Sequence, residues 1–435
     1  MRHVRKYNQI LGFYMPSMFH LHVHTKQNIK KWWKWDDETQ CTFLHEYIHF
    51  LQDISTTAGL YNIYVMGECL QDRVTRVYKM ANNRVKVPIP LVPGANNVLN
   101  NHIIRDAVEG TTDLIGVDET TLQITGKAAV TNHTLNMNGT IIPYHEVIVP
   151  FATGSFLLGN YHISESMAYL GEQIMYGGSP GVVQPSPNYP YDVVRQLAHY
   201  YSPQLENNLP LMFALCDVAL TFSHSGYALV NFFENYVVAG CPRDWKAFVL
   251  NQISATKVFG TNGMQTYQDG LRGIKDLAIH SLDQRFNNAT YNDIRRWYYN
   301  IINRAVEMRF QYPLYIYDFV SGGELKKNRQ FRQLMKGIGT PVLTNDYFKT
   351  SFTTKVTGCA LRKRRAQYLI AAGSITYALG DALIPCELVD ICRAKHRCVG
   401  RKCKNAPWKH SRKWFACPYG HLWYGWGLKD KELVV

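Results

Sequence analysis

The segment His45-Glu46-Tyr47-Ile48-His49 combines two imidazoles and a carboxylate at a spacing that suits zinc chemistry. Residues four apart on a helix point the same way, so both imidazoles can bind one tetrahedral ion. Glu46 would lie beside that ion, where it can take a proton from a zinc-bound water whose pKa the metal lowers toward neutrality. The spacing therefore predicts His45 and His49 as metal ligands and Glu46 as the catalytic base.

The surrounding sequence predicts a helix that would hold this segment in place. It begins at the acidic residues 36–38, whose charge and capping side chains favour a helix N-terminus. The helical pattern continues to about Thr57, and Gly59 is placed to end it. A second helix is predicted over roughly 61–80. The apolar stripe of the first helix consists of Leu44, Tyr47, Ile48, Leu51 and Ile54.

The stretch from Leu44 to Asp53, Leu-His-Glu-Tyr-Ile-His-Phe-Leu-Gln-Asp, resembles the active-site helix of the zincin metallopeptidases. In that superfamily the two histidines ligate zinc and the glutamate is the general base. The resemblance implies these roles for His45, His49 and Glu46, and it covers this helix and at most one more. No third histidine follows at the short spacing of metzincins, which points to the gluzincin branch, where the third ligand is a glutamate.

Two glutamates compete as that third ligand. Glu165 begins a Glu-Ser-Met-Ala sequence similar to the Glu-x-x-Ala pattern of gluzincin third-ligand helices, and the small Ala168 would let two helices approach closely. Glu165 follows His49 by 116 residues, which requires a long insertion between them. Glu68 follows by only 19 residues, a spacing typical of gluzincins, but its context matches less well. Glu165 is favoured, and Asp53 better suits a supporting role beside a ligand.

A hydrogen-bond donor beside the metal would stabilise the oxyanion that forms when a peptide carbonyl is attacked. His162 and Tyr161 precede Glu165 by one turn of a predicted helix, so either could face the zinc. Of the two, His162 is the residue predicted to be catalytic. His224 and Tyr227 form a second polar cluster that is less favoured, because a turn with a satisfied histidine is common.

Residues 17–25 alternate between apolar and polar side chains with a period of two, which predicts a strand. His20, His22 and His24 would share one face of it. Three histidines on one face could bind a metal. The simpler interpretation, which is favoured, is a half-exposed strand.

The C-terminal tail is rich in cysteine, basic and aromatic residues. It could hold a second, structural zinc, or its cysteines could be buried free thiols, since short Cys-x-x-Cys knuckles are absent. Its cations and interleaved aromatics suit nucleic acid or an acidic protein surface. The residues concerned include Cys386, Cys392, Cys398, Cys403, Cys417, His396, His410, His421, Trp408, Trp414 and Phe415.

The composition bounds these interpretations. The 435 residues are 46% hydrophobic and 18% charged, so a large core is available and global disorder is not expected. The net charge of +14 points to anionic partners without establishing one. We expect no secretory signal and no membrane span, and hence a cytoplasmic protein.

Together these patterns predict an α+β fold in three regions. Residues 1–190 would form a zincin-like catalytic region with a β-rich insertion at about 121–151, residues 191–385 a mostly helical region, and residues 386–435 the Cys-rich tail. The function expected is that of a zinc-dependent metallopeptidase acting on a protein or peptide. The alternatives are a zinc hydrolase of a non-peptide bond, or a nucleic-acid or protein-binding module with a structural metal.

Overall fold

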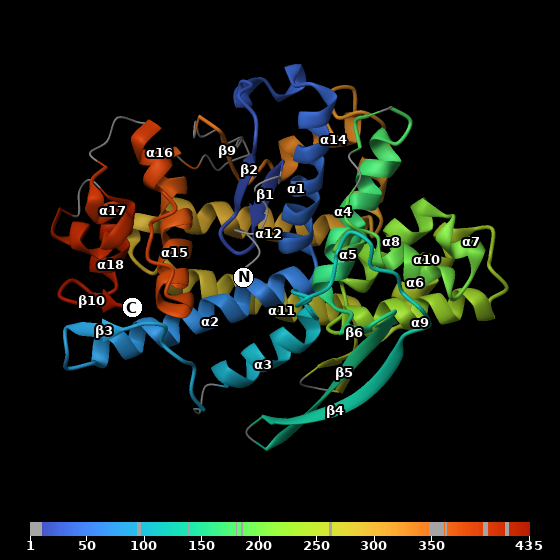
Figure 1. Cartoon of the computed structure of the whole chain (residues 1–435), viewed down its shortest axis with the longest axis horizontal. Coiled ribbons are helices and arrows are strands. Elements are labelled where there is room, and N and C mark those ends of the chain that lie inside the picture. The colour runs from blue at the N-terminus through green and yellow to red at the C-terminus, as the bar shows by residue number, and fades with distance from the viewer. Residues whose placement is uncertain are drawn as a thin grey trace.

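The chain forms a mixed helical and β structure in which helices dominate and the described strands form small, separate sheets (Figure 1). The computed structural model describes residues 11–93, 97–137, 139–179, 181–183, 186–260, 263–347, 361, 363–394, 399–413 and 417–435.

The His-Glu-x-x-His segment lies in the middle of helix α1 (Asp37–Ser55). The carboxylate of Asp36 caps this helix by accepting a hydrogen bond from the backbone N–H of Thr39 at 2.8 Å. The helix ends before the glycine expected to stop it, because Thr56 adopts an extended backbone and its side chain caps the next helix, α2 (Thr57–Lys79). The predicted helix therefore forms, and it ends two residues before Thr57, where the pattern was expected to stop.

A three-stranded sheet lies against α1, in the order β1 (Gly12–Met15), β2 (His20–Val23) and β9 (Val342–Asn345). The pair β1–β2 is antiparallel, whereas β2 and β9 are parallel. Gly12 permits the close approach of β1, since a Cβ there would lie 2.8 Å from the carbonyl oxygen of His22 and 3.3 Å from Cγ of Glu46. The half-exposed strand favoured for residues 17–25 is wrong, because β2 is the central strand and is buried along its length.

The β-rich stretch predicted at about 121–151 forms an antiparallel sheet of β4 (Ala129–Met137), β5 (Thr140–Phe151) and β6 (Gly154–Leu157). The long hairpin of β4 and β5 projects from the body of the molecule (Figure 1). Strand β6, the last of this sheet, leads into α4 (Asn160–Tyr176), which packs against α1. A side chain at Gly171 would place its Cβ 2.6 Å from Cδ1 of Ile48, so this glycine lets α4 approach α1 closely.

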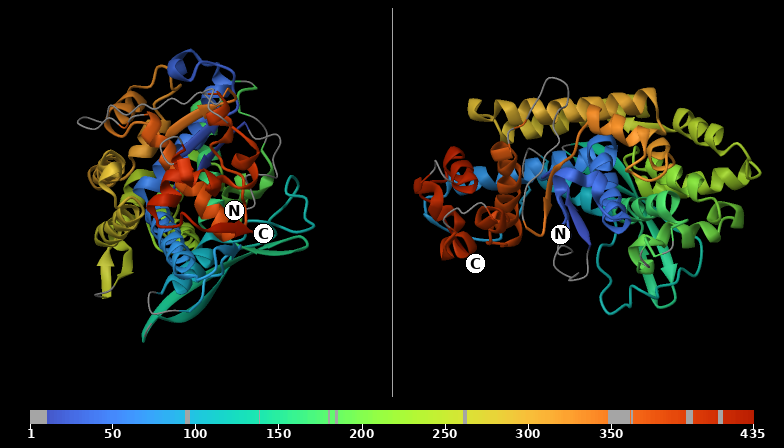
Figure 2. Two further views of the ribbon diagram at one scale, coloured as in Figure 1. Left: turned by 90° about the vertical axis from the view of Figure 1, so that its left-hand side faces the viewer. Right: turned by 90° about the horizontal axis from the view of Figure 1, so that it is seen from above.

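Helices after α4 build both ends of the molecule. Those of residues 203–255 lie at one end and those of the C-terminal tail at the other (Figures 1 and 2). The α-helices and strands not yet named are β3 (Arg84–Lys86), α3 (Val98–Glu109), α5 (Asn188–Tyr191), α6 (Val193–His199), α7 (Pro203–Glu206), α8 (Leu209–Ala219), α9 (Ser225–Val238), α10 (Trp245–Ala255), β7 (Lys257–Gly260), β8 (Gly263–Thr266), α11 (Tyr267–Arg285), α12 (Asn292–Gln311), α13 (Tyr315–Val320), α14 (Arg329–Gly337), α15 (Lys363–Asp381), α16 (Val389–Ala394), α17 (Arg401–Asn405), α18 (Pro418–Gly425) and β10 (Glu432–Val434). Short 3-10 helices span Ile29–Lys34, Ala289–Tyr291 and Pro407–Lys413.

One cluster of buried apolar side chains runs through all three regions distinguished in the sequence. It includes Tyr47 of α1, Phe213 of α8 and Trp423 of α18. The last strand, β10, also pairs in parallel with β3 of the N-terminal region. The three regions therefore share a core. In the described part of the chain, no helix is both long and apolar enough to cross a membrane.

A buried ion pair joins three helices at the end of α1. Arg309 of α12 forms a two-bond pair with the carboxylate of Asp217 of α8, with N–O distances of 2.8 and 3.0 Å, and both side chains are almost fully buried. Arg309 also donates a hydrogen bond to the hydroxyl of Ser55, the last residue of α1, at 3.1 Å. This pair fixes the C-terminal end of the motif helix against the helical core.

Substituting Asp217→Ala should lower the free energy of unfolding by about 3–5 kcal/mol, because the charge of Arg309 would stay buried without its partner. Denaturant unfolding followed by circular dichroism would measure the change. Asp276→Ala is the matched control, since the carboxylate of Asp276 is exposed and its ion pair with Lys275 therefore contributes little. A loss for Asp217→Ala no larger than that of the control would contradict this assignment.

Candidate metal centre

The two motif histidines and Glu165 converge on one point between α1 and α4. The Oε2 atom of Glu165 lies 3.3 Å from Nε2 of His45 and 3.5 Å from Nε2 of His49. Two ligand atoms about 2.1 Å from a tetrahedral zinc are separated by roughly 3.4 Å. Both distances to Glu165 thus match those between ligands of a single ion, and the ligand atoms of all three side chains lie within 4.8 Å of one another. All three side chains are largely buried.

Two further side chains orient the imidazoles. Nδ1 of His45 is hydrogen bonded to Oε1 of Glu172 at 2.6 Å, and Nδ1 of His49 to Oε1 of Gln52 at 2.8 Å. Because both acceptors are oxygens, we assign the proton of each imidazole to Nδ1, which leaves Nε2 free to bind a metal. Sequence reasoning missed these partners, although Glu172 follows Glu165 by two helical turns and so shares its face of α4.

The charges at the centre are strongly coupled. Burial opposes ionisation of Glu165, but His49 and His45 outweigh it and hold the pKa of this carboxyl below its usual range. Burial likewise opposes protonation of His45, yet its bonds to Glu165 and Glu172 raise its pKa. Without a metal, the protons on the imidazoles therefore balance the negative charge of the carboxylates. A metal cation that bound in place of these protons would release them.

Glu46 is buried beside these ligands. Burial raises the pKa of its carboxyl to about 6, although the neighbouring His45 and His49 act in the opposite direction. A carboxyl whose pKa is near the operating pH is suited to accept a proton and later return it.

The structure places the other carboxylate candidates outside the ligand group, although Asp53 lines the same cavity as His49 and Glu165. Glu68, the rival third ligand, lies on α2 with its half-buried carboxyl near His280 of α11. Asp53 accepts hydrogen bonds from the hydroxyl of Tyr14 at 2.8 Å and the N–H of Ser17 at 3.0 Å, and burial raises its pKa to about 7. Asp53 thus ties α1 to β1 and to the segment that follows it.

His162 caps its own helix and does not join the ligand group. Its Nδ1 accepts a hydrogen bond from the backbone N–H of Gly159 at 3.2 Å, and its Nε2 is bonded to the hydroxyl of Tyr189 at 2.9 Å. Burial lowers its pKa to about 3, so it stays neutral. Both ring nitrogens are thus engaged within the protein, and the geometry argues against the oxyanion role predicted for His162.

A cavity of about 550 Å³ borders the centre. His49, Glu165 and Tyr161 line it, so Tyr161 is better placed than His162 to meet a substrate. Arg105 of α3 also lines the cavity. Tyr191, which the sequence did not single out, places its ring 5.9 Å from that of His45.

The polar cluster of His224 and Tyr227 lies at the start of α9, against strand β5 of the projecting sheet. The ring of Tyr227 stacks on His145 of β5 at 4.1 Å, and the ring of His224 lies 5.3 Å from His145. Neither residue belongs to the ligand group around Glu165.

The tail cysteines gather around α16 to α18. Sγ of Cys403 lies 3.2 Å from Nε2 of His410. Burial raises the pKa of the thiols of Cys386 and Cys417, and neighbouring cysteines act in the same direction. In the part of the chain that the structure describes, these atoms are not grouped as closely as those of the metal centre. Cys398 and His396 lie outside the described residues, and the structural zinc stays a prediction.

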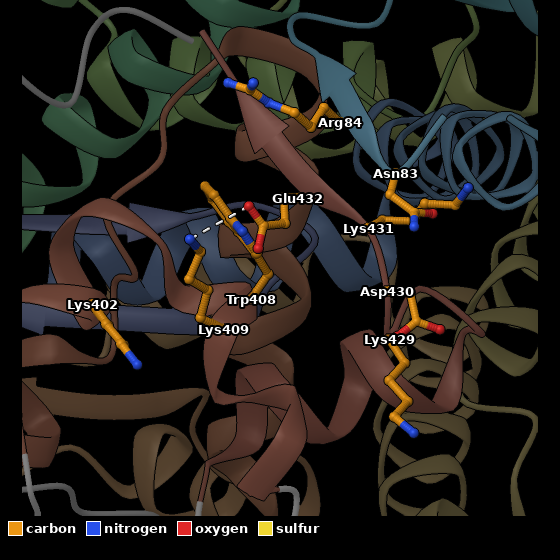
Figure 3. A pocket seen from close by; sticks show the side chains of 9 residues that line it. All are labelled: Asn83, Arg84, Lys402, Trp408, Lys409, Lys429, Asp430, Lys431 and Glu432. Atoms are coloured by element: carbon orange, nitrogen blue, oxygen red, sulfur yellow. Dashed lines mark ion pairs between the residues drawn. The ribbon is translucent and has the colours of Figure 1, made fainter. Parts of the chain in front are cut away.

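The basic residues of the tail border a second cavity, of about 420 Å³, beside β3 and β10. Figure 3 shows that Lys402 and Lys429 lie on opposite sides of this cavity, while Lys409 forms an ion pair with Glu432 at 3.4 Å. These cations do not converge on one point, as the recognition of a small anion requires. Trp414 and Phe415 lie outside the described residues, and an acidic protein or nucleic acid as partner of the tail stays a prediction.

Comparison with protein-family models, with curated proteins and with solved structures found no match for this chain.

Proposed function

We propose that the chain is a zinc-dependent metallopeptidase with a zincin-like centre of gluzincin type. The observation that carries this proposal is the convergence of Glu165 on both imidazoles of the motif, at 3.3 and 3.5 Å, from a helix far away in the sequence. Two imidazoles and a carboxylate are a common ligand set of catalytic zinc, with a coordination position left for water or substrate. Bound there, zinc would lower the pKa of water and polarise a carbonyl.

In this proposal the protein's own groups carry the proton. Glu46 takes a proton from the attacking water as the new C–O bond forms at the peptide carbonyl. It then gives that proton to the leaving nitrogen as the C–N bond breaks. Glu172 and Gln52 keep the two imidazoles oriented through both steps. Tyr161 lines the cavity where the substrate would lie, and its hydroxyl is our candidate donor to the developing oxyanion.

The zinc-loaded protein should cleave peptides from a diverse synthetic library. Mass spectrometry of the products would identify the bonds that break. A zinc chelator should abolish cleavage, and added Zn²⁺ should restore it, because the ligands are held in place by the protein. If the protein hydrolysed esters but left every peptide intact, the result would favour a zinc hydrolase of a non-peptide bond. Both enzymes would activate water in the same way, so only the bond that breaks distinguishes them.

A further inference from the structure

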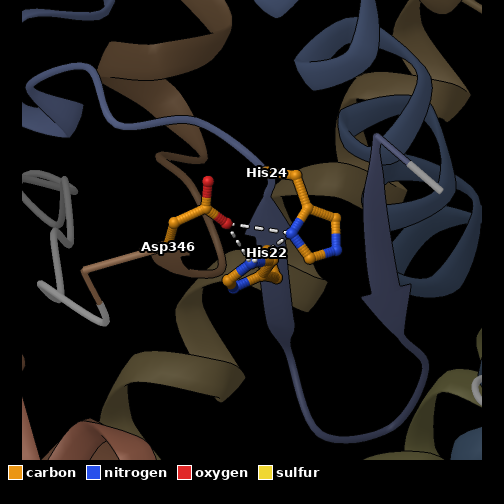
Figure 4. A group of neighbouring side chains, drawn as sticks. All are labelled: His22, His24 and Asp346. Carbon is orange, nitrogen blue, oxygen red and sulfur yellow. Dashed lines mark hydrogen bonds and ion pairs between the residues drawn. The ribbon is translucent and has the colours of Figure 1, made fainter. Parts of the chain in front are cut away.

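A second group of potential ligands lies at the carboxyl ends of two parallel strands (Figure 4). His22 is in β2 and His24 follows it, while Asp346 directly follows β9. The register pairs His22 with Thr344, which brings the ends of both strands together. A backbone hydrogen bond from the N–H of Asp346 to the carbonyl of Thr25, at 3.2 Å, fixes this end of the sheet.

The three side chains point toward one another (Figure 4). Nε2 of His22 lies 3.3 Å from Nδ1 of His24 and 3.6 Å from Oδ1 of Asp346, and Nδ1 of His24 lies 2.9 Å from that same oxygen. These distances bracket the separation of roughly 3.4 Å between ligands of a tetrahedral zinc. Hydrogen bonds of His24 to His22 and to Asp346 account for two sides of this triangle, whereas a cation accounts for all three.

The sheet holds His22 in the orientation that a ligand needs. Its Nδ1 is bonded to Oγ1 of Thr344 at 2.9 Å, and the ring of Phe13 stacks on it at 5.0 Å. We assign the proton to Nδ1, which donates it to the hydroxyl of Thr344. That hydroxyl has other acceptors for its own proton, namely Nε2 of His20 at 2.9 Å and the carbonyl of Leu21 at 3.5 Å. Nε2 of His22 then directs its lone pair at His24 and Asp346, an arrangement in which a supporting residue orients a metal ligand.

We propose that His22, His24 and Asp346 bind a divalent transition-metal ion, with Zn²⁺ as the first candidate. Two imidazoles and one carboxylate suit this class of ion rather than Mg²⁺ or Ca²⁺. The side chain of His22 is 3% exposed, whereas those of His24 and Asp346 are 46% and 34% exposed. The remaining coordination positions therefore face solvent, where water or a small ligand can occupy them.

Such an ion would join distant parts of the chain. It would link β2, near the N-terminus, to β9, and β2 in turn pairs with β1, which packs beside Glu46. This site does not depend on the proposed peptidase activity, since it shares no ligand with the centre of His45, His49 and Glu165.

Zinc content after equilibrium dialysis of the full chain against buffered Zn²⁺ tests the proposal. His24→Ala and Asp346→Asn should each bind one equivalent less than the wild type, and His24→Ala combined with His49→Ala should bind two less. His133→Ala is the matched control, because His133 pairs with Glu146 on the hairpin at 3.2 Å without a third ligand, and it should lose none.

Both variants should fold, because His24 is exposed and asparagine has the shape of Asp346; circular dichroism checks this. Retention of the wild-type zinc content by folded His24→Ala and Asp346→Asn would overturn the proposal. Loss of zinc in the His133→Ala control would overturn it as well. The His49→Ala variant alone reports on the motif centre, so failure at one site is distinguishable from failure at the other.

Discussion

Glu46→Gln should lower the kcat for peptide hydrolysis by roughly 10²- to 10⁴-fold, the usual contribution of a general base. Glutamine keeps the size of the side chain but cannot take the proton from the attacking water. Glu46 does not belong to the ligand group of His45, His49 and Glu165, so the variant should keep its zinc. Steady-state kinetics on a cleaved peptide, with zinc content measured on the same sample, would show both effects.

Glu38→Gln is the matched control, because Glu38 is an exposed glutamate of the same helix. Its kcat should equal that of the wild type. A Glu46→Gln variant that kept both its zinc and at least half of its activity would exclude Glu46 as the base. It would then favour a binding module in which the metal is structural.

Glu165→Ala should weaken zinc binding at the motif centre by at least about 100-fold, more than the loss of a group that only orients a ligand. The substitution removes one of the three ligand atoms and leaves two imidazoles with Nε2 atoms that no longer face a carboxylate. Competition of each variant with a chromophoric chelator would measure the affinity.

Glu68→Ala serves as the control for this experiment, because Glu68 was the rival third ligand and lies on α2 near His280. It should bind zinc as tightly as the wild type. Weakened binding in Glu68→Ala, with normal binding in Glu165→Ala, would reverse the assignment of the third ligand.

The sequence predicted the parts of the centre that depend on local spacing. The acidic cap at Asp36, the apolar stripe and the pair His45 and His49 lie on one helix, where the period of 3.6 residues decides which side chains share a face. Glu165 was favoured through a short pattern, and the structure brings it beside both histidines. That these residues bind zinc stays a prediction.

Other features depend on contacts between distant residues. Asp346 meets His22 and His24 only because β9 pairs with β2 across more than 300 residues, and no local pattern reports that pairing. His162 was placed on the expected helix, but the backbone N–H of Gly159 and the hydroxyl of Tyr189 engage its ring. Helical spacing predicts which residues share a face of the helix, but it does not predict which hydrogen-bond partner a side chain on that face has.

The most direct test of the central claim is an anomalous difference map, recorded at the zinc absorption edge, from crystals of the zinc-loaded chain. Our account predicts a peak about 2.0–2.2 Å from Nε2 of His45, Nε2 of His49 and the carboxylate of Glu165. Zinc found only at the cysteine tail or at His22, with no peak between α1 and α4, would contradict the proposed metallopeptidase centre.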